Sequence, residues 1–269
     1  MITVAIITKN EELNIARCLT SVKWADEIIV VDAYSTDRTC AIARELGATV
    51  IEREWTGFAA QKEFALQQAS GDWVLSLDAD EEVTAALKDE ILKTIILDGH
   101  GDGFEIPRKS FFLGRWIRYG GWYPGYQLRL LRKSKAKMNH RPVHEGFSVD
   151  GTIGRLTADI NHYTYASLHQ YIDKMNDYSS LDVSQKIGKH GTIRWYNFLL
   201  NPLAAFFRIY VSLQGFRDGF HGFLLASYSS LHVLVIYAKS WEYQQAIKNG
   251  VPSPPISSEA IAELKRLVQ

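Results

Sequence analysis

Short apolar runs alternate with helix-like segments over the first eighty residues. Runs rich in branched and aromatic side chains predict four strands, at residues 2–7, 27–32, 49–52 and 73–77. Between them, apolar residues recur at helical spacing and predict three helices, at residues 13–22, 40–46 and 59–68. Short strands that alternate with helices of about ten residues predict a parallel sheet with right-handed crossovers.

Three polar loops follow the first, second and fourth of these strands, at residues 8–12, 32–37 and 78–80. Ligands of open parallel sheets bind outside the carboxyl ends of the strands, where all three loops are expected. The third loop, Asp78-Ala79-Asp80, leads into residues 81–84, which we expect to start a helix. Two carboxylates in this arrangement suit Mg²⁺ or Mn²⁺, whose remaining ligands are water and substrate phosphates. An acidic loop entering a helix is the alternative for this motif alone.

The three loop motifs together resemble a known family. They are the sequences VAIITKNEE from residue 4, VVDAYSTDRT from residue 30 and GDWVLSLDADE from residue 71. This combination resembles the nucleotide-sugar domain of family 2 glycosyltransferases, over roughly residues 1–165. Within the family, the chain is most similar to bacterial enzymes that add glucose in β-1,4 linkage to the inner core of lipopolysaccharide or lipooligosaccharide. The resemblance implies a GT-A fold: α/β, Rossmann-like, with a mostly parallel sheet flanked by helices.

The resemblance also implies a donor site for a UDP-sugar. The residues that would contact the nucleotide sugar are Thr8, Glu11, Asp32, Asp37, Lys62, Asp78 and Ala79. Asp32 would accept a hydrogen bond from the uracil ring, because a carboxylate selects a ring edge that donates. An aspartate that caps the next helix is the alternative for Asp32, and a solvated surface lysine is the alternative for Lys62.

For the metal and the chemistry, the resemblance points to further positions. Asp80 would bind Mg²⁺ or Mn²⁺ directly, with Asp78 and His162 as further ligands; a structural histidine is the alternative for His162. Glu145 would be the catalytic base of an inverting transfer, with His144 beside it, although the family more often has Glu-Asp at this place. Gly120, Gly121 and Trp122 would contact the donor or acceptor, or form a plain turn.

Charge is distributed unevenly, although the formal net charge is zero. Residues 1–100 carry nine basic and eighteen acidic side chains, whereas residues 101–145 carry ten basic and three acidic ones. A basic segment beside a metal-carboxylate site suggests an anionic acceptor or a phospholipid surface. Nucleic acid is the less favoured partner, since the aromatic residues of this segment are equally typical of a sugar-stacking or lipid-edge surface.

The final third predicts helices of a different kind. Residues 195–213 and 220–238 are apolar and aromatic but interrupted by polar side chains, so we expect amphipathic helices on a membrane surface rather than a membrane span. Arg194, Arg208 and Arg217 would face lipid headgroups. A packed helical subdomain or a homodimer interface is the alternative. The expected division is therefore a nucleotide-sugar half at 1–100, an acceptor half at 101–165, an amphipathic helical region at 166–250 and a tail at 251–269.

Cys18 and Cys40 form no disulfide or zinc pattern, and Met1 leads straight into the first strand without a signal peptide, which favours a reducing cytoplasm. We therefore expect an inverting, metal-dependent transferase that moves glucose from UDP-glucose to a lipid A–core type glycolipid. It would act peripherally at the cytoplasmic face of the bacterial inner membrane. Transfer to polyprenyl phosphate or to a capsule intermediate, and a non-catalytic binding module on the same fold, remain alternatives.

Overall fold

The computed structural model describes residues 1–97, 101–139, 146–165, 167–187 and 193–249. The chain divides into two compact units. The first comprises Met1–Ser110 and Pro124–Thr164, and the second comprises Phe111–Tyr123 and Tyr165–Gln269. Residues 111–123, which we placed in the acceptor half, therefore belong to the unit that contains the C-terminal helices.

The first unit is built on a seven-stranded sheet with the order β12-β6-β9-β4-β1-β2-β3. Its first elements along the chain are β1 (Ile2–Thr8), α1 (Ile15–Ser21), β2 (Glu27–Asp32), α2 (Thr39–Glu45), β3 (Thr49–Glu52), α3 (Phe58–Gln68) and β4 (Trp73–Asp78). Strands β1 to β4 pair in parallel, which confirms the predicted sheet. Strand β9 (Gln127–Arg132) is antiparallel to both β4 and β6 (Gly103–Ile106), and β12 (Ile153–Arg155) is parallel to β6.

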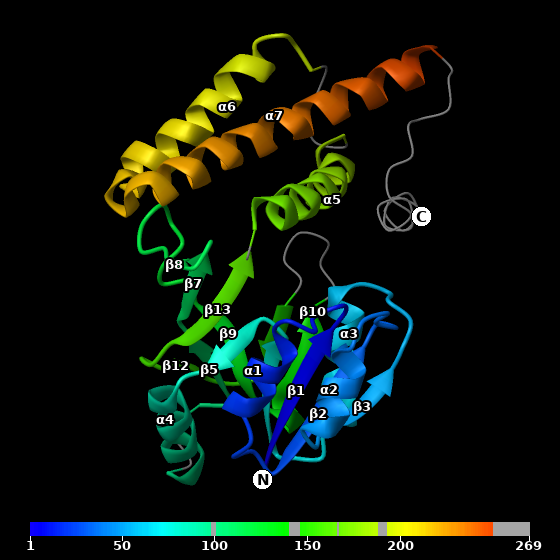
Figure 1. Cartoon of the computed structure of the whole chain (residues 1–269), viewed down its shortest axis with the longest axis vertical. Coiled ribbons are helices and arrows are strands. Elements are labelled where there is room, and N and C mark those ends of the chain that lie inside the picture. The colour runs from blue at the N-terminus through cyan, green and yellow to red at the C-terminus, as the bar shows by residue number, and fades with distance from the viewer. Residues whose placement is uncertain (98–100, 140–145, 166, 188–192, 250–269) are drawn as a thin grey trace. The chain divides into compact units, whose positions relative to one another are not determined.

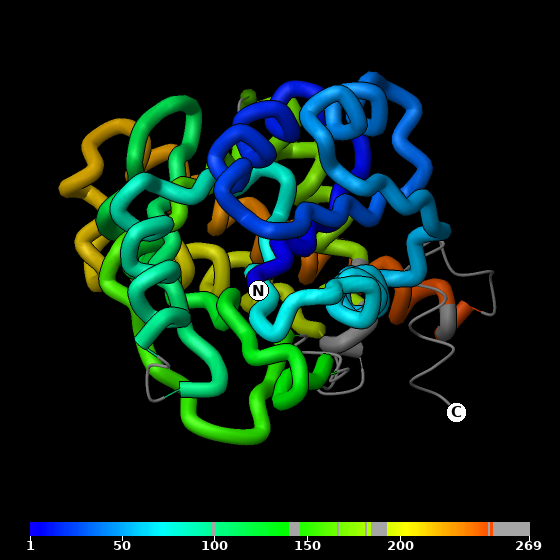
Figure 2. The backbone as a smooth tube through the Cα atoms, turned by 90° about the horizontal axis from the view of Figure 1, so that it is seen from below, coloured from blue at the N-terminus to red at the C-terminus, as the bar shows by residue number. Residues whose placement is uncertain are grey.

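Alternate residues of β1 enter two different cores. Val4 and Ile6 pack in a cluster that includes α1, α2 and α4 (Ala85–Ile96), whereas Ala5 and Ile7 pack with α3. Figure 2 shows α1 and α2 on one side of β1 and α3 on the other. A strand covered on both faces is apolar at nearly every position, as residues 2–7 are. The one polar residue among them, Thr3, is buried and donates its hydroxyl to Glu27.

Residues 81–84 do not start a helix, so that prediction is wrong. Glu81–Val83 form strand β5, which pairs antiparallel with β13 (Ile160–Tyr165), and Glu81 lies opposite His162. Helix α4 begins at Ala85, where the Thr84 side chain caps it by accepting the Leu87 amide. The acidic pattern is typical of a helix start, but Glu81 and Val83 are both buried. Burial of these side chains therefore outweighs their local propensity to start a helix. The resulting pairing of β5 with β13 places His162 beside the acidic loop.

The remaining strands form two smaller sheets. Strands β7 (Arg108–Phe112) and β8 (Arg115–Trp116) extend the β5–β13 pair to a four-stranded sheet with the order β5-β13-β7-β8. Strands β10 (Ala136–Asn139) and β11 (Gly146–Val149) form an antiparallel pair. The fold class is mixed α/β with a mostly parallel central sheet, as predicted.

The second unit is helical over most of its described length. It contains α5 (Leu168–Ile187), α6 (Asn197–Phe207) and α7 (Gly219–Asn249). A π-helical turn at Arg208–Ser212 and a 3₁₀ turn at Gly215–Asp218 connect α6 to α7. Figure 1 shows α6 and α7 side by side, and the ring centroids of Phe206 and Phe223 lie 6.0 Å apart between them.

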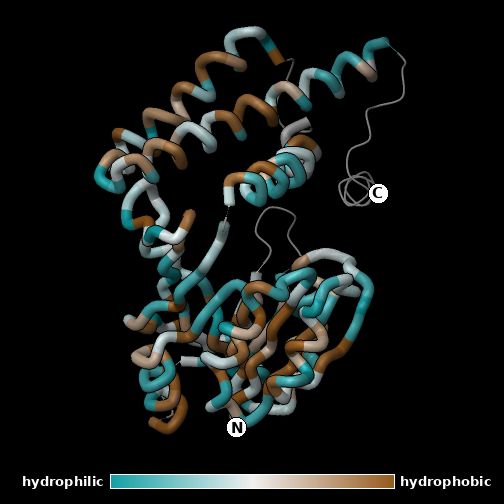
Figure 3. The backbone as a smooth tube through the Cα atoms, viewed as in Figure 1, coloured by the Kyte–Doolittle hydropathy of each residue, from teal (hydrophilic) through white to brown (hydrophobic). Residues whose placement is uncertain are grey.

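Helix α7 is longer than we expected. The predicted segment 220–238 lies within it, and its serine and histidine residues do not interrupt the helix. Within the described part of the chain, residues Gly215–Ala246 are one helix long and apolar enough to cross a membrane, by length and composition only; its most apolar 18-residue stretch has a mean hydropathy of 1.4 and is 22% buried. Figure 3 shows polar colours toward the C-terminal end of α7. The expected tail, 251–269, lies outside the described residues.

Candidate functional site

Hydrogen bonds join the loop that follows β1 to the loop that follows β2. The Asn10 amide donates to the Ser35 hydroxyl at 2.8 Å, and the Asn10 side-chain oxygen accepts the Thr36 amide at 2.8 Å. Asn10 and Tyr34 both have positive φ angles, of 54° and 53°, a conformation that non-glycine residues rarely adopt. Strain of this kind persists where the surrounding structure holds it and is concentrated at ligand sites. The structure thus brings together two of the three loops that the sequence singled out.

Two predicted uridine residues lie at the base of these loops. Thr8 is buried, and its hydroxyl has no hydrogen-bond partner within the described part of the chain. Asp32 is fully buried and accepts both the Ser35 amide, at 2.7 Å, and the Ser35 hydroxyl, at 2.5 Å. Asp32 therefore closes the turn after β2 with its carboxylate. Burial, and then a hydrogen bond and charge repulsion from Asp32, raise the pKa of the Cys40 thiol to about 12.

Glu11 and Asp37, two more of the predicted nucleotide residues, hold local structure. The Glu11 carboxylate accepts the Asn14 side-chain amide at 2.7 Å. Asp37 accepts both the amide and the hydroxyl of Thr39, at 3.0 and 2.5 Å. Burial raises the pKa of the Asp37 carboxyl, but these hydrogen bonds and that of the Glu12 amide lower it further, so its pKa lies below the ordinary value. Asp37 is thus ionised and fixed at the start of α2.

Asp78, at the end of β4, lies between two cations. Its carboxylate is 2.8 Å from the Lys62 ammonium and 2.5 Å from the Arg129 guanidinium. Arg129 is only 4% exposed and also contacts Glu81, at 2.7 Å, whose side chain is fully buried. Burial alone would raise the pKa of Asp78, but the charges of Arg129 and Lys62 outweigh it and hold the pKa well below its usual range. Lys62 is thus paired with Asp78, and its contact with the nucleotide sugar stays a prediction.

Sequence reasoning missed Arg129 and Glu81. Glu81 accepts the Asp78 amide at 2.9 Å, so the two residues fix both the backbone and the side chain of Asp78. Arg108 lies 3.8 Å from Glu81 as a further cation. The available signal was the sequence Leu128-Arg129-Leu130-Leu131, because an arginine within an apolar strand is buried only when it is paired.

The low pKa of Asp78 predicts an acid-sensitive fold. An unfolded aspartate has a pKa of about 3.9, so the stabilisation from ionised Asp78 is complete above that pH and is lost as the pH falls below it. We expect the urea midpoint of the wild-type protein to fall between pH 5 and pH 3 more steeply than that of Asp78→Asn. Asp150→Asn, at an exposed position, is the control and should behave as the wild type. Equal slopes for the wild type and Asp78→Asn would contradict the assignment.

Asp80 and His162 form a second polar pair, 3.5 Å apart between Oδ2 and Nε2. The other ring nitrogen of His162 hydrogen-bonds the Ser110 hydroxyl at 3.1 Å, which orients the imidazole. Asp80 Oδ1 is buried and has no hydrogen-bond partner among the described residues. A buried carboxylate oxygen beside an oriented imidazole fits Mn²⁺ or Mg²⁺, whose other ligands would come from substrate phosphates and water. The described residues contain no group of three His, Cys, Asp or Glu side chains that could hold a metal by itself.

Six predicted positions remain, and they fall into three groups. Glu145 and His144 lie outside the described residues. Ala79 is buried in the apolar core beside Asp78. Gly120 and Gly121, with φ angles of 68° and 82°, and Trp122 belong to the second unit, where Trp122 packs edge-on against Phe112.

Comparison with known proteins identifies the family. Residues 3–146 match Glycosyl transferase family 2. The lipopolysaccharide core biosynthesis glycosyltransferase LpsC of Rhizobium meliloti is 29% identical over 244 residues, which are 88% of this chain and 90% of LpsC. The uncharacterized glycosyltransferase RT0209 of Rickettsia typhi is 36% identical over 246 residues, or 83% of this chain and 80% of that protein.

Among solved structures, mannosyltransferase PcManGT from Pyrobaculum calidifontis, in complex with GDP-Man and Mn²⁺, superimposes with a TM-score of 0.50. The alignment covers 89% of this chain and 86% of PcManGT at 16% identity, a likeness that concerns the fold alone. The family match spans more than half of the chain and includes all three loops at the carboxyl edge of the sheet. This protein therefore belongs to glycosyltransferase family 2 and has the GT-A fold.

Proposed function

We propose that this protein transfers glucose from UDP-glucose, with inversion, to a glycolipid of the lipopolysaccharide core. The observation that carries the proposal is the arrangement at the carboxyl edge of the sheet. There, Asp80 Oδ2 lies 3.5 Å from His162, and Asp80 Oδ1 is buried without a hydrogen-bond partner among the described residues. The nearby Asp78 carboxylate is fixed by Lys62 and Arg129. The relation to LpsC supports the choice of acceptor.

In the proposed reaction, the residues bind the nucleoside, bind the cation or transfer the proton. Thr8, Glu11, Asp32 and Asp37 border the nucleoside, and Asp78 with Ala79 borders the ribose. Asp80 and His162 would hold the cation, which would supply positive charge to neutralise the departing UDP. Glu145 takes the proton of the acceptor hydroxyl. As it does so, the acceptor oxygen forms a bond to the anomeric carbon and the bond from that carbon to the diphosphate breaks. Lys62 adds a positive charge near the diphosphate when its ammonium group contacts both Asp78 and the ligand.

The proposal of a membrane-borne acceptor is supported by the many apolar side chains that the second unit exposes along α6, α7 and the turns between them. They include Leu199, Leu200, Leu203, Phe207, Val211, Phe216, Phe220 and Phe223. A helix with exposed aromatic and aliphatic residues and nearby arginines is typical of one that lies in a membrane interface. We accordingly propose a peripheral position at the cytoplasmic face of the inner membrane, where UDP-sugars and lipid-linked acceptors meet.

A thermal-shift panel tests the donor site. We expect UDP with Mn²⁺ to raise the melting temperature by several degrees, since a ligand at 100 times its Kd stabilises the folded state by about 2.7 kcal/mol. A chelator should remove most of that shift, because Asp80 and His162 bind the diphosphate through the cation. GDP, CDP and TDP, each with Mn²⁺, are the matched controls.

Two outcomes would overturn the proposal in different ways. A shift in melting temperature with GDP or CDP alone would support a glycosyltransferase whose donor is not a UDP-sugar. No shift with any nucleotide would favour a non-catalytic module. Product analysis with UDP-glucose and de-glucosylated core glycolipid then tests the sugar and the acceptor, and polyprenyl phosphate serves as the competing acceptor.

A further inference from the structure

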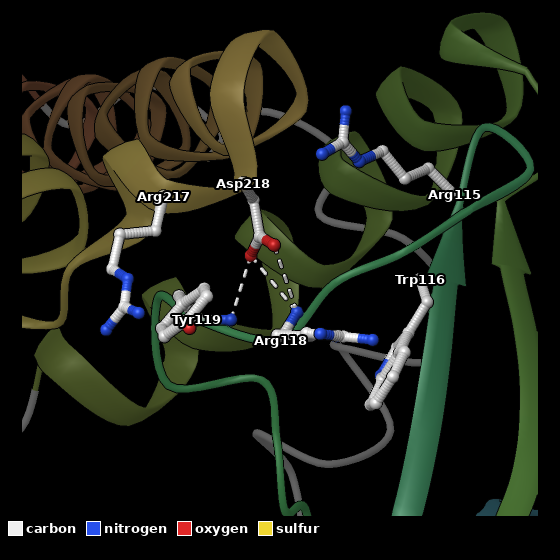
Figure 4. A pocket seen from close by; sticks show the side chains of 6 residues that line it. All are labelled: Arg115, Trp116, Arg118, Tyr119, Arg217 and Asp218. Atoms are coloured by element: carbon white, nitrogen blue, oxygen red, sulfur yellow. Dashed lines mark hydrogen bonds between the residues drawn. The ribbon is translucent and has the colours of Figure 1, made fainter.

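The second unit contains a basic pocket whose lining includes none of the predicted donor residues. It is lined by Arg115, Trp116, Arg118, Tyr119, Arg217 and Asp218 and has a volume of about 400 Å³. Figure 4 shows the six side chains, which come from the segment after β7 and from the turn between α6 and α7. All six belong to the second unit, so the pocket is a feature of that unit alone.

Among the described residues, Asp218 is the one acid that lines the pocket, and its carboxylate already accepts hydrogen bonds. It is 3% exposed and accepts the backbone amides of Arg118, at 3.1 Å, and Tyr119, at 2.8 Å. Those bonds tie the 3₁₀ turn to residues 118–119 (Figure 4). The Asp218 carboxylate therefore stabilises the backbone that lines the pocket by accepting two amides, and it does not pair with an arginine side chain.

The turn that carries Arg217 and Asp218 is fixed by close backbone packing. A Cβ added at Gly222 would lie 1.9 Å from the Gly215 carbonyl oxygen, and one at Gly215 would lie 2.7 Å from the Ile209 carbonyl oxygen. Both positions therefore require glycine for the backbones to approach. A turn held in this way presents its side chains in a preformed arrangement, which lowers the entropy lost when a ligand binds.

The side chains that line the pocket carry a net positive charge, with three arginines and one aspartate. Within the described residues, none of Arg115, Arg118 and Arg217 forms an ion pair with an aspartate or glutamate side chain. Arg118 lies over the Trp116 ring at 4.1 Å, and Arg217 over the Tyr119 ring at 4.3 Å. Arg217 also donates from Nη1 to the Gln214 side-chain oxygen at 3.0 Å. Stacking on an aromatic face leaves the other N–H groups at the edge of a guanidinium available, and that edge matches the oxygens of a phosphate.

Apolar side chains surround the same turn. Leu213, Phe216 and Phe220 are exposed within seven residues of Arg217, and Phe220 is 68% exposed. A soluble anion would gain nothing from this exposed apolar surface, whereas a lipid whose charged headgroup enters the pocket would place its acyl chains beside it. The combination of unpaired arginines and exposed aromatics therefore favours a lipid as the source of the anion.

We propose that the pocket lined by Arg115, Arg118 and Arg217 binds the phosphate of an anionic membrane lipid. The inference rests on the membrane location proposed above, and it is independent of the donor site. Its consequence is a specific attachment point: one headgroup phosphate is held in the pocket while the phenylalanines of the turn enter the lipid layer.

Vesicle sedimentation with the full chain tests this proposal. We expect the wild type to bind phosphatidylcholine vesicles that contain phosphatidylglycerol more tightly than phosphatidylcholine alone. Arg217→Lys keeps the charge but loses the planar donor edge, so it should weaken binding to the anionic vesicles about fivefold. Arg208→Lys is the matched control on an exposed position of the same helical hairpin outside the pocket, and it should bind as the wild type does.

Other results would overturn the proposal. If Arg217→Lys binds as the wild type, and Arg208→Gln weakens binding as much as Arg217→Gln, the attraction is general electrostatics and not a pocket. If glycerol phosphate or inorganic phosphate raises the melting temperature as much as the lipid does, the ligand is a soluble phosphate. Each variant should keep the wild-type melting temperature and the UDP-dependent shift. Loss of vesicle binding with an intact UDP shift separates this inference from the donor site.

Discussion

Replacement of Arg129 by methionine is expected to lower the free energy of unfolding by about 3–5 kcal/mol. The guanidinium is almost fully buried and lies between Asp78, at 2.5 Å, and Glu81, at 2.7 Å. Its removal leaves the fully buried Glu81 charge without its nearest cation, since Arg108 is 3.8 Å away. Urea unfolding at neutral pH, followed by circular dichroism, measures the loss.

Two comparisons separate this effect from a simple change of charge. Arg155→Met removes an exposed arginine that pairs with Glu105, and it should leave the urea midpoint unchanged within error. Adding Glu81→Gln to Arg129→Met should restore part of the lost stability, because the carboxylate that needed the cation is gone. A single Arg129→Met variant as stable as the wild type would show that Arg129 does not stabilise the acidic loop.

Replacement of Asp80 by asparagine is expected to reduce sugar transfer at least about 100-fold, since even outer partners of a metal site typically cost 10- to 100-fold when they are lost. The buried Oδ1 of Asp80, which has no hydrogen-bond partner among the described residues, is the oxygen best placed to bind the cation. Asparagine keeps the shape but loses the charge, so the fold should persist. Initial rates with UDP-glucose at saturating and limiting Mn²⁺ measure the loss.

The matched control is Asp89→Asn, which removes the same charge from an exposed position of helix α4. It should transfer sugar at the wild-type rate. A second readout is the UDP-dependent thermal shift, which should lose its dependence on Mn²⁺ in Asp80→Asn and keep it in Asp89→Asn. Transfer by Asp80→Asn at the wild-type rate, or an undiminished rate in chelator, would remove the metal from the mechanism.

Parts of the fold that follow from local pattern were predictable. Strands β1 to β4 and the loops at their carboxyl ends agree with the sequence, because strands buried on both faces need continuous apolar runs. Residues 81–84 were misread because their acidic pattern is equally suited to a helix start and to a short strand with one buried glutamate. The helix predicted at residues 220–238 continues to Asn249 in α7, because a helix tolerates the polar side chains that end the apolar run.

The amino-acid sequence by itself determined the parallel sheet, the placement of three polar loops at one edge, and the family. These depend on the order of apolar and polar residues over short stretches. Only the tertiary structure decided which side chains meet: Arg129 with Asp78 and Glu81, His162 with Asp80, and Arg217 with the turn that holds Arg118. The partners lie about 50 to 100 residues apart, and pairing at that separation is set by strand order and helix packing, which no local pattern encodes.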